Sequence, residues 1–395
     1  MFMHRIKLEN ILSFGPEAQD LELRPLNVLI GPNGSGKSNL IEVIGLLKAA
    51  TDDIMAPVRE GGGGDNWMCR NEREVSEARV GVDVELPFIR PKKLLRYSLA
   101  FGPFFLGTPN LREEIGEVGE TERGDDSSEL YVKRRRGEVT VTYRDESGKR
   151  SQRELNPTDV EADQSILSQL KDPTQYPELT FVGMELARMR LYREWSLGRN
   201  TPPRLPQKAD LPNRFLSEDA RNLGMVLNRF EGNPDAKKKF LTALRKLYRG
   251  IDDYFVQIEA GTVQVFLREG NVPISATRLS DGTLRYLCLL AVLCNPALPS
   301  LVCIEEPELG LHPDILPSLA DLLREASERC QLIVTTHSDI LVDALTETPE
   351  SIIICEKENG QTKLERLNKD ELSHWLEKYR LGELWTSGEL GGTRW

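Results

Sequence analysis

Hydrophobic and polar positions along the first fifty residues predict two strands, a loop and a helix. Apolar and polar side chains alternate over residues 3–12, whereas residues 21–30 become almost continuously apolar toward their end. Alternation is typical of a half-exposed strand, and a continuous apolar run indicates a strand covered on both faces. After a glycine-rich turn, residues 38–50 carry apolar side chains at helical spacing. We therefore expect strand, glycine loop and helix in that order.

The middle of the chain changes from a strand-like to a helical pattern near residue 160. Period-two alternation over 78–102 and 130–155 predicts an antiparallel meander. Between these stretches, Glu113–Glu129 holds eight acids and one arginine without an apolar period, which indicates a mobile, solvated acidic loop. Four prolines in 200–212 interrupt the helical pattern that follows. Helices are expected at 165–170, 179–195, 219–230 and 236–248.

Short apolar runs dominate the last third of the chain. Residues 300–306 and 331–336 are almost wholly apolar, as in strands that are buried on both faces. Sustained heptads are absent from the sequence, which excludes a long coiled coil. The remaining expected elements are strands at 254–269 and from Ile352, a hairpin through Asn359-Gly360, and helices at 284–294 and 369–379.

Composition favours a cytoplasmic protein without a membrane segment. The longest uninterrupted apolar run, Tyr286–Cys294, has nine residues, against roughly 18 to 20 for a transmembrane helix. The first residues lack the pattern of a secretory signal. Six cysteines form no C-x-x-C pair and do not cluster with the four histidines, so we expect reduced thiols and no structural zinc.

Charge is distributed unevenly along the chain. The net charge is -11, yet residues 185–250 hold 15 lysines and arginines against 7 acids. A cationic segment of this kind suits contact with a phosphate backbone or an acidic partner protein. The alternative is a solvated arginine-rich face that pairs with acids elsewhere in the chain.

A phosphate-binding motif follows the second predicted strand. Residues 31–38 match G-x-x-x-x-G-K-[ST] in full, and a predicted helix comes directly after them. In this motif the backbone N–H groups surround the phosphates, Lys37 reaches the β- and γ-phosphates, and the Ser38 hydroxyl binds magnesium. The residues expected to contact the nucleotide are Asn33, Gly34, Ser35, Gly36, Lys37, Ser38 and Asn39.

Two buried strands end in side chains that suit phosphoryl transfer. Residues 300–304 lead into Glu305 and Glu306, which supply one carboxylate for a metal and one for an attacking water. The second strand ends at Thr336-His337, where the histidine reaches a γ-phosphate. The alternatives are helix-capping acids and a packed histidine without a role in chemistry.

A third candidate is the turn Ser280-Asp281-Gly282-Thr283 before the apolar helix. A Ser-x-Gly turn at a helix N-terminus presents a hydroxyl, backbone amides and a positive dipole to an anion. Taken alone, the same residues are explained by helix capping.

Together these motifs resemble those of an ABC-type ATPase. Walker A at 31–38, a signature-like stretch at 279–283, Walker B running into Glu305-Glu306-Pro307, and His337 occur in the family's order. More narrowly, the chain is similar to the non-transporter branch that includes RecF, the SMC proteins and the OLD-type ATPases. The resemblance implies an α/β fold: a P-loop ATPase head with a mixed β-sheet core, an antiparallel β subdomain and an inserted helical lobe.

The resemblance also implies a mechanism. ATP and Mg²⁺ are held in a head-to-tail homodimer, between the Lys37 loop of one protomer and Ser280–Thr283 of the other; this homodimer is either ATP-dependent or constitutive. Glu306 corresponds to the general base, Glu305 and Ser38 to the magnesium ligands, His337 to the γ-phosphate switch, and 309–312 to the loop that crosses to the partner. For the family's glutamine loop, Gln164 and Gln169 are the candidates.

Three positions depart from the family pattern. Glu305 stands where many relatives have aspartate, and Asp281 replaces the first glycine of the signature. Either change is a reason to expect slower turnover, because like charge near the γ-phosphate opposes binding. Leu12 occupies a position that is often basic in RecF-like proteins, so a nucleotide or DNA contact made there is expected to be missing.

On this basis we expect five regions: 1–60 with Walker A, 61–160 as the antiparallel β subdomain, 161–270 as the basic helical insertion, 271–360 as the rest of the core, and 361–395 as a tail. The 58 residues after His337 are too few for the Toprim nuclease of OLD-type proteins. We therefore expect a separately encoded effector, such as a Toprim-like nuclease, in defence against phage.

Three functional hypotheses stay open at this point. The first is a mechanoenzyme that couples ATP to DNA processing or to effector control. The second is a slow ATP-dependent scaffold that stores and releases a toxic effector. The third is a transporter ATPase subunit, against which the long insertion and the 10–14 stretch argue.

Overall fold

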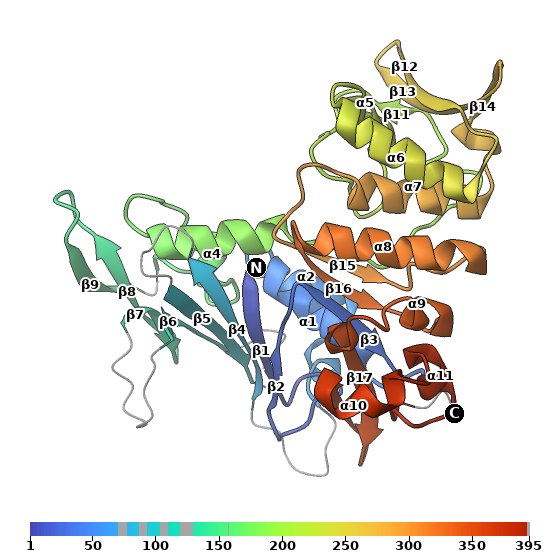
Figure 1. Ribbon diagram of the computed structural model, residues 1–395. Helices are drawn as coiled ribbons and strands as arrows, with labels where there is room; N and C mark the ends of the chain where they lie inside the picture. Colours follow the sequence, from blue (N-terminus) through green and yellow to red (C-terminus); the bar gives the residue numbers. More distant parts are fainter. Residues whose placement is uncertain (70–76, 87–92, 103–109, 119–128, 157, 393–395) are drawn as a thin grey trace. The chain divides into compact units, whose positions relative to one another are not determined.

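The computed structural model describes the chain except for residues 70–76, 87–92, 103–109, 119–128, 157 and 393–395 (Figure 1). The described residues divide into two compact units, each assembled from separated stretches. The first unit contains residues 1–24, 31–189 and 354–365, and the second contains 25–30, 190–353 and 366–395.

An antiparallel sheet organises the first unit. Alternate residues of its strands are buried, as the period-two pattern predicts. In spatial order the strands are β2 (Gln19–Glu22), β1 (Met3–Glu9), β4 (Ala78–Leu86), β5 (Lys93–Phe101), β6 (Leu111–Glu117), β7 (Leu130–Arg135), β8 (Glu138–Arg144) and β9 (Arg150–Leu155). The expected meander is confirmed. The acidic loop was predicted to begin at Glu113, and this is wrong, because residues 113–117 belong to β6; residues 119–128 of that prediction lie outside the described residues.

The first unit contains three helices that the sequence pattern predicts and one, α2, that it does not predict. They are α1 (Lys37–Ala49), α2 (Met55–Glu60), α3 (Ile166–Gln169) and α4 (Pro177–Arg188), with a 3-10 turn, η1, at Gly64–Asn66. The helix predicted over 179–195 ends at Arg188. Residues 190–192 instead form strand β10, which pairs in parallel with Val302–Ile304. Their backbone groups thus find partners in a neighbouring strand, which a single-sequence helical pattern does not reveal.

Parallel strands form the centre of the second unit (Figure 1). β10 (Arg190–Tyr192), β15 (Leu301–Glu305), β16 (Gln331–Thr335) and β3 (Leu26–Ile30) lie side by side in this order. Every residue of β3 and β16 is buried, which confirms strands covered on both faces. The single strand expected over 21–30 is divided in two, because β2 ends at Glu22 and β3 begins after Pro25, which has no N–H to donate.

A smaller sheet and two helices make up the inserted part of the second unit. The sheet contains β11 (Gln207–Lys208), β12 (Asp253–Glu259), β13 (Thr262–Glu269) and β14 (Val272–Ser275), and the helices are α5 (Leu223–Glu231) and α6 (Pro234–Leu247). Phe240 packs its ring against Phe230 at 6.0 Å and against Tyr254 at 5.0 Å, in edge-to-face geometry. This aromatic core joins both helices to the sheet.

The remaining elements of the second unit are helices and short 3-10 turns. In the second unit they are η2 (Ala276–Arg278), α7 (Asp281–Leu293), η3 (Pro313–Ile315), α8 (Leu316–Ser327), α9 (Asp339–Asp343), η4 (Pro349–Ser351), α10 (Lys369–Leu376) and α11 (Leu381–Thr386). The division between the units runs through β17 (Ile352–Glu358) and β18 (Gln361–Arg366), which form the predicted hairpin. None of the helices in the described parts of the chain has the length and apolar character needed to cross a bilayer.

Candidate nucleotide-binding site

The phosphate loop has the geometry that its sequence predicts. It lies between β3 and α1, and three of its glycines have positive φ: 146° at Gly31, 74° at Gly34 and 104° at Gly36. A Cβ at Gly31 would lie 2.1 Å from the Cys355 carbonyl oxygen, so this position has no room for another side chain. At Gly34, a Cβ would meet nothing within 4 Å, which marks the open side of the loop.

Lys37 is buried inside this loop. Its Nζ donates hydrogen bonds to the carbonyl oxygens of Gly31 and Pro32, at 2.8 and 2.9 Å. The Ser35 hydroxyl is buried and has no hydrogen-bond partner within the described residues. Because an orphaned polar group is costly, this hydroxyl fits a ligand with acceptor oxygens. Ser38 is exposed in the first turn of α1, whose N-terminus lacks a side-chain cap and so presents free N–H groups.

Three side chains with hydroxyl or amide groups form a hydrogen-bonded chain that ends on the backbone of the phosphate loop. Thr362 Oγ1 donates to the Ser35 carbonyl at 2.7 Å and shares a 2.6 Å hydrogen bond with Ser13 Oγ. Asn39 Nδ2 donates to the same Ser13 oxygen at 2.6 Å. The Asn39 side chain, expected at the nucleotide, is thus engaged in this support. Sequence reasoning missed Thr362, since no local motif relates it to a loop more than 300 residues earlier.

At the carboxyl edge of the parallel strands, the second unit brings its own candidates together. The register aligns Leu29 of β3 with Thr335 of β16, and Thr335 with Glu305 of β15. Glu305 accepts a 3.0 Å hydrogen bond from Arg193 Nε through one oxygen, and its other oxygen is buried without a partner among the described residues. A carboxylate with one unsatisfied oxygen suits a metal ion or a metal-bound water.

Glu306 occupies a strained backbone conformation. Its φ is 45°, in the left-handed region that non-glycine residues rarely adopt. The backbone of Thr335 holds it there, because the Glu306 N–H donates to the Thr335 carbonyl at 3.0 Å. The Glu306 side chain is partly exposed and lies 3.7 Å from His337 Nε2. Strain of this kind costs about 1 to 3 kcal/mol and is often found at functional positions.

Glu308 connects the Walker B strand to the histidine. Its Oε1 accepts hydrogen bonds from the Thr336 hydroxyl and from the His337 backbone N–H, both at 2.8 Å. Burial raises the pKa of this carboxyl above its ordinary value. Sequence reasoning did not assign Glu308 a role, although its place two residues after Glu306 was a usable signal.

The signature turn opens helix α7 as expected. Ser280 Oγ accepts from the Thr283 N–H at 3.1 Å, in the manner of a helix cap. A Cβ on Gly282 would lie 2.4 Å from the Gly310 carbonyl oxygen, so the signature turn packs directly against the loop at 309–312. Asp281 forms an ion pair with Arg204. Leu309 is 48% exposed in that neighbouring loop.

The two glutamines proposed for the glutamine loop differ in their surroundings. Gln169 accepts from the Glu161 N–H at 2.7 Å and donates to nearby carbonyls, so it closes the turn before α3. Gln164 has a buried side-chain oxygen without a partner among the described residues.

A family model described as "AAA domain, putative AbiEii toxin, Type IV TA system" matches residues 26–343, which is most of the chain. The chain belongs to this family. Its fold is that of an ABC-type ATPase head, as shown by similarity to solved SMC heads. One is an Smc head bound to the C-winged helix domain of ScpA, with a TM-score of 0.57, 16% identity and coverage of 94% of this chain and 99% of that chain.

Another similar structure is the Smc head with an extended coiled coil bound to the C-terminal domain of ScpA from Pyrococcus furiosus. Its TM-score is 0.58 at 14% identity, and the match covers 95% of this chain and 99% of that chain. A search of the curated proteins finds no match. The resemblance to the RecF- and SMC-like ABC ATPases and the expected α/β class are both confirmed at the level of family and fold.

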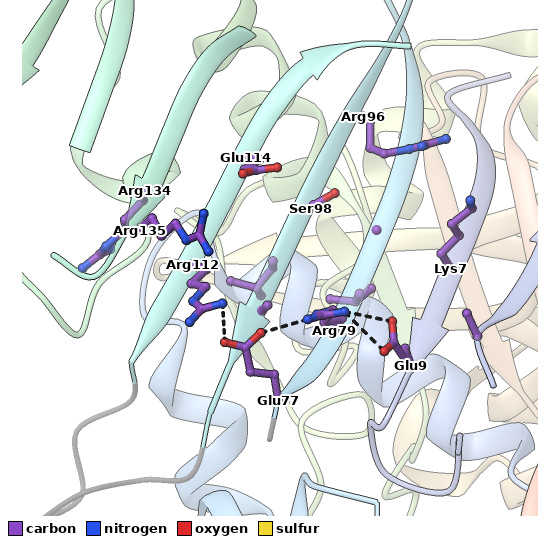
Figure 2. A pocket seen from close by; sticks show the side chains of 15 residues that line it. Lys7, Glu9, Glu77, Arg79, Arg96, Ser98, Arg112, Glu114, Arg134 and Arg135 are labelled. Carbon is purple, nitrogen blue, oxygen red and sulfur yellow. Dashed lines mark hydrogen bonds and ion pairs between the residues drawn. The ribbon is translucent and has the colours of Figure 1, made fainter. Parts of the chain in front are cut away.

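A separate hollow of about 370 Å³ lies on the antiparallel sheet (Figure 2). Its floor is made of small residues, because the strand register places Gly81 beside Ser98. Ion pairs form part of its wall, where Arg79 bridges Glu9 and Glu77 and where Arg112 contacts Glu77 at 2.7 Å. The accessible cationic side chains that line it are Lys7, Arg79, Arg96, Arg112 and Arg135.

Proposed function

We propose that this protein binds ATP with Mg²⁺ and hydrolyses it through Glu306. The observation that carries the proposal is the pairing of Glu306, fixed at a φ of 45°, with His337 at 3.7 Å, at the carboxyl ends of two parallel strands. A third parallel strand, β3, leads into the phosphate loop at Gly31. Ligands of open parallel sheets bind beyond the carboxyl ends of the strands.

Each residue has a defined task in the proposed reaction. The N–H groups of residues 33–36 and the Lys37 ammonium bind the phosphates, and Asn39 keeps the loop in shape. Ser38 and Glu305 are the ligands for Mg²⁺, which when bound neutralises charge on the β- and γ-phosphates. Glu306 orients a water and accepts its proton, while His337 donates a hydrogen bond to the γ-phosphate. Glu308 holds His337 in place by accepting a hydrogen bond from the His337 backbone N–H.

The signature turn extends the proposal to a head-to-tail homodimer. Ser280 and Asp281 are exposed and Gly282 is partly exposed at the start of α7, where Ser280 caps the helix. In the proposed assembly, Ser280–Thr283 bind the γ-phosphate of the partner's ATP. The exposed Leu309 then lies at the contact between protomers.

For the output, we propose control of a separately encoded effector in defence against phage. The description of the family names a putative toxin of a toxin–antitoxin system, and the similar SMC heads are bound to domains of another protein. These findings support a partner protein, with a Toprim-like nuclease as one candidate. Deleting the gene should increase sensitivity to at least one phage in a broad panel, and unchanged sensitivity across the panel contradicts the defence role.

The alternative is a slow scaffold that stores a toxic effector while ATP is bound. In that case Glu306→Gln should keep the effector bound, and free effector in this variant excludes storage. A transporter subunit is the least supported reading, because the inserted lobe between the phosphate loop and the signature turn has its own aromatic core.

Contact with DNA is a second candidate, and the exposed Arg135 in the hollow of Figure 2 favours it. Five accessible cations and three glutamates line this hollow. Arg135 forms no ion pair within the described residues, whereas the other four cations are paired with acids: Lys7 with Asp20, Arg79 with Glu9 and Glu77, Arg96 with Asp83, and Arg112 with Glu77. Several cations of the 185–250 segment are paired with acids as well: Arg188, Arg193, Arg204, Arg221, Lys237 and Lys239. Each lost phosphate contact should lower the salt dependence of DNA binding by about one unit of slope.

Two charge reversals distinguish the two surfaces. Arg135→Glu alters the hollow, and Lys238→Glu alters the 185–250 segment. Binding of a labelled duplex across a salt series should weaken with Arg135→Glu and stay unchanged with Lys238→Glu. The reverse order places the contact in the basic segment, and no binding by the wild type contradicts the DNA role.

Phosphate release from Mg-ATP tests the enzymatic proposal directly. The wild type should turn over, and Glu306→Gln should lose at least about 100-fold in turnover while still binding ATP. Lys363→Gln, on the surface and paired with the exposed Glu17, is the matched control that should leave turnover unchanged. Equal turnover in the wild type and Glu306→Gln contradicts the assignment of the base.

A further inference from the structure

The inserted segment between β10 and α5 sends one buried arginine to the signature turn. Arg204 lies in the proline-rich stretch of this insertion and is only 5% exposed. Its Nε donates to the Leu197 carbonyl at 2.6 Å, within the same inserted segment. Its Nη1 donates to the Leu279 carbonyl at 2.5 Å and to the Ala276 carbonyl at 3.3 Å. Four of the five guanidinium donors are engaged once the bond from Nη2 to Asp281 Oδ1 is included.

These contacts fix the chain just before helix α7. Ala276 is the first residue of the turn η2, Leu279 follows this turn, and Ser280 is the N-cap of α7. Holding both carbonyls therefore sets the direction in which the signature turn enters the helix. A planar guanidinium can satisfy several acceptors in one fixed geometry, which a lysine ammonium does less well.

Asp281 adds a charge problem that the same arginine resolves. Its side chain is 73% exposed, at the position where glycine stands in the signature that this stretch resembles. A carboxylate there is favourable for the helix dipole but repels the phosphates of a bound triphosphate. Arg204, which is buried beside it, supplies the opposite charge without occupying the surface.

We propose that Arg204 is a positioning residue of the ATP sandwich: held at the signature turn by the Leu279 and Ala276 carbonyls, it neutralises Asp281, so that the turn accepts the partner's triphosphate. This inference rests on the proposed function. It gives the inserted segment a role in nucleotide binding. It also means that Asp281 by itself is no reason to expect slow turnover, because Arg204 balances its charge.

A purely structural role for Arg204 predicts a different pattern of mutations. If the arginine only satisfies the Leu279 and Ala276 carbonyls, its loss should be equally harmful whether residue 281 is charged or neutral. If charge compensation matters, neutralising residue 281 should recover much of what the loss of Arg204 removes. A double-mutant cycle separates the two.

The experiment measures ATP-dependent association in a Glu306→Gln background by sedimentation. Arg204→Met should raise the ATP concentration for half-maximal association by at least about tenfold, which corresponds to about 1.4 kcal/mol. Asp281→Asn should change it by less than about threefold, and the double variant should return to within about threefold of the background. The matched control is Arg221→Met, an exposed arginine of the same insertion that pairs with Asp219; it should have no effect.

Several outcomes overturn the inference. If the double variant associates no better than Arg204→Met, the role of Arg204 is structural only. If Arg204→Met associates like the Glu306→Gln background, Arg204 has no role in association. If Arg204→Met does not fold, Arg204→Lys keeps the charge and should remain within about threefold of the background; a loss of tenfold or more in a folded Lys variant contradicts charge compensation. Failure of the Glu306→Gln chain itself to associate, with ATP bound, instead contradicts the proposed sandwich.

Discussion

Substituting Gly282 by alanine tests the contact between the signature turn and the loop at 309–312. The added Cβ would lie 2.4 Å from the Gly310 carbonyl oxygen and 3.5 Å from its carbon. Ordinary contacts begin near 3.4 Å, so one of the two backbone segments must withdraw by about 1 Å. Neither group is the end of a flexible side chain, so the shift moves the start of α7 or the loop itself.

The size of the effect follows from this displacement. Overpacking of this kind costs roughly 1 to 3 kcal/mol, and in a unit of about 200 residues that lowers the melting temperature by roughly 2 to 12 °C. A shift of about 1 Å in a positioning element also costs up to about 100-fold in function. We therefore expect Gly282→Ala to stay folded at 20 °C but to lose ATP-dependent association, while a single chain still binds ATP.

The assay combines thermal unfolding with sedimentation in the Glu306→Gln background. Gly232→Ala is the control, because its Cβ would lie at an ordinary 3.5 Å from the Arg229 carbonyl oxygen and its backbone is helical. The control should match the background in both measurements. If Gly282→Ala has the same melting temperature and the same ATP-dependent association as the background, the close contact and the role given to it are refuted.

Three further predictions concern other parts of the chain. Lys37→Ala removes the ammonium from the phosphate loop and should abolish ATP binding, as measured by equilibrium dialysis; binding within threefold of wild type contradicts its role. Burial raises the pKa of Glu308, so the folded state binds this proton more tightly than the unfolded state, and stability falls as the pH rises above about 4.5. Glu308→Gln cannot ionise, so its stability relative to wild type should improve between pH 4.5 and 7 in urea titrations, and a flat or falling difference contradicts this. Burial also raises the pKa of four cysteine thiols to about 12, so iodoacetamide at pH 8 should modify them only after unfolding, as checked by mass spectrometry; rapid native labelling contradicts their burial. These thiols belong to Cys288, Cys294, Cys330 and Cys355.

Local patterns allowed the main elements of the fold to be predicted. The phosphate loop, the buried strands before Glu305 and Thr336, and the antiparallel meander all depend on neighbouring residues, so periodicity and glycine spacing indicate them. The helix expected through 190–195 failed because β10 gains its hydrogen bonds from β15, more than a hundred residues later. Tertiary pairing overrode local spacing there.

The candidate site was only partly predictable for the same reason. Glu306 and His337 occur at recognisable strand ends, but the partners that orient the site come from distant sequence. Thr362 supports the phosphate loop, and Arg204 pairs with Asp281 across 77 positions. Arg204 was counted among the cations of a basic surface, whereas the structure buries it. Neither a charge count nor a motif states which arginine is buried.

The central claim is that ATP joins two copies of this chain through the signature turn. The solution mass of Glu306→Gln, with and without Mg-ATP, tests it most directly, because this variant should keep the nucleotide bound. We predict one protomer without ATP and two with it. A mass that stays at one protomer while ATP is bound would contradict the head-to-tail assembly.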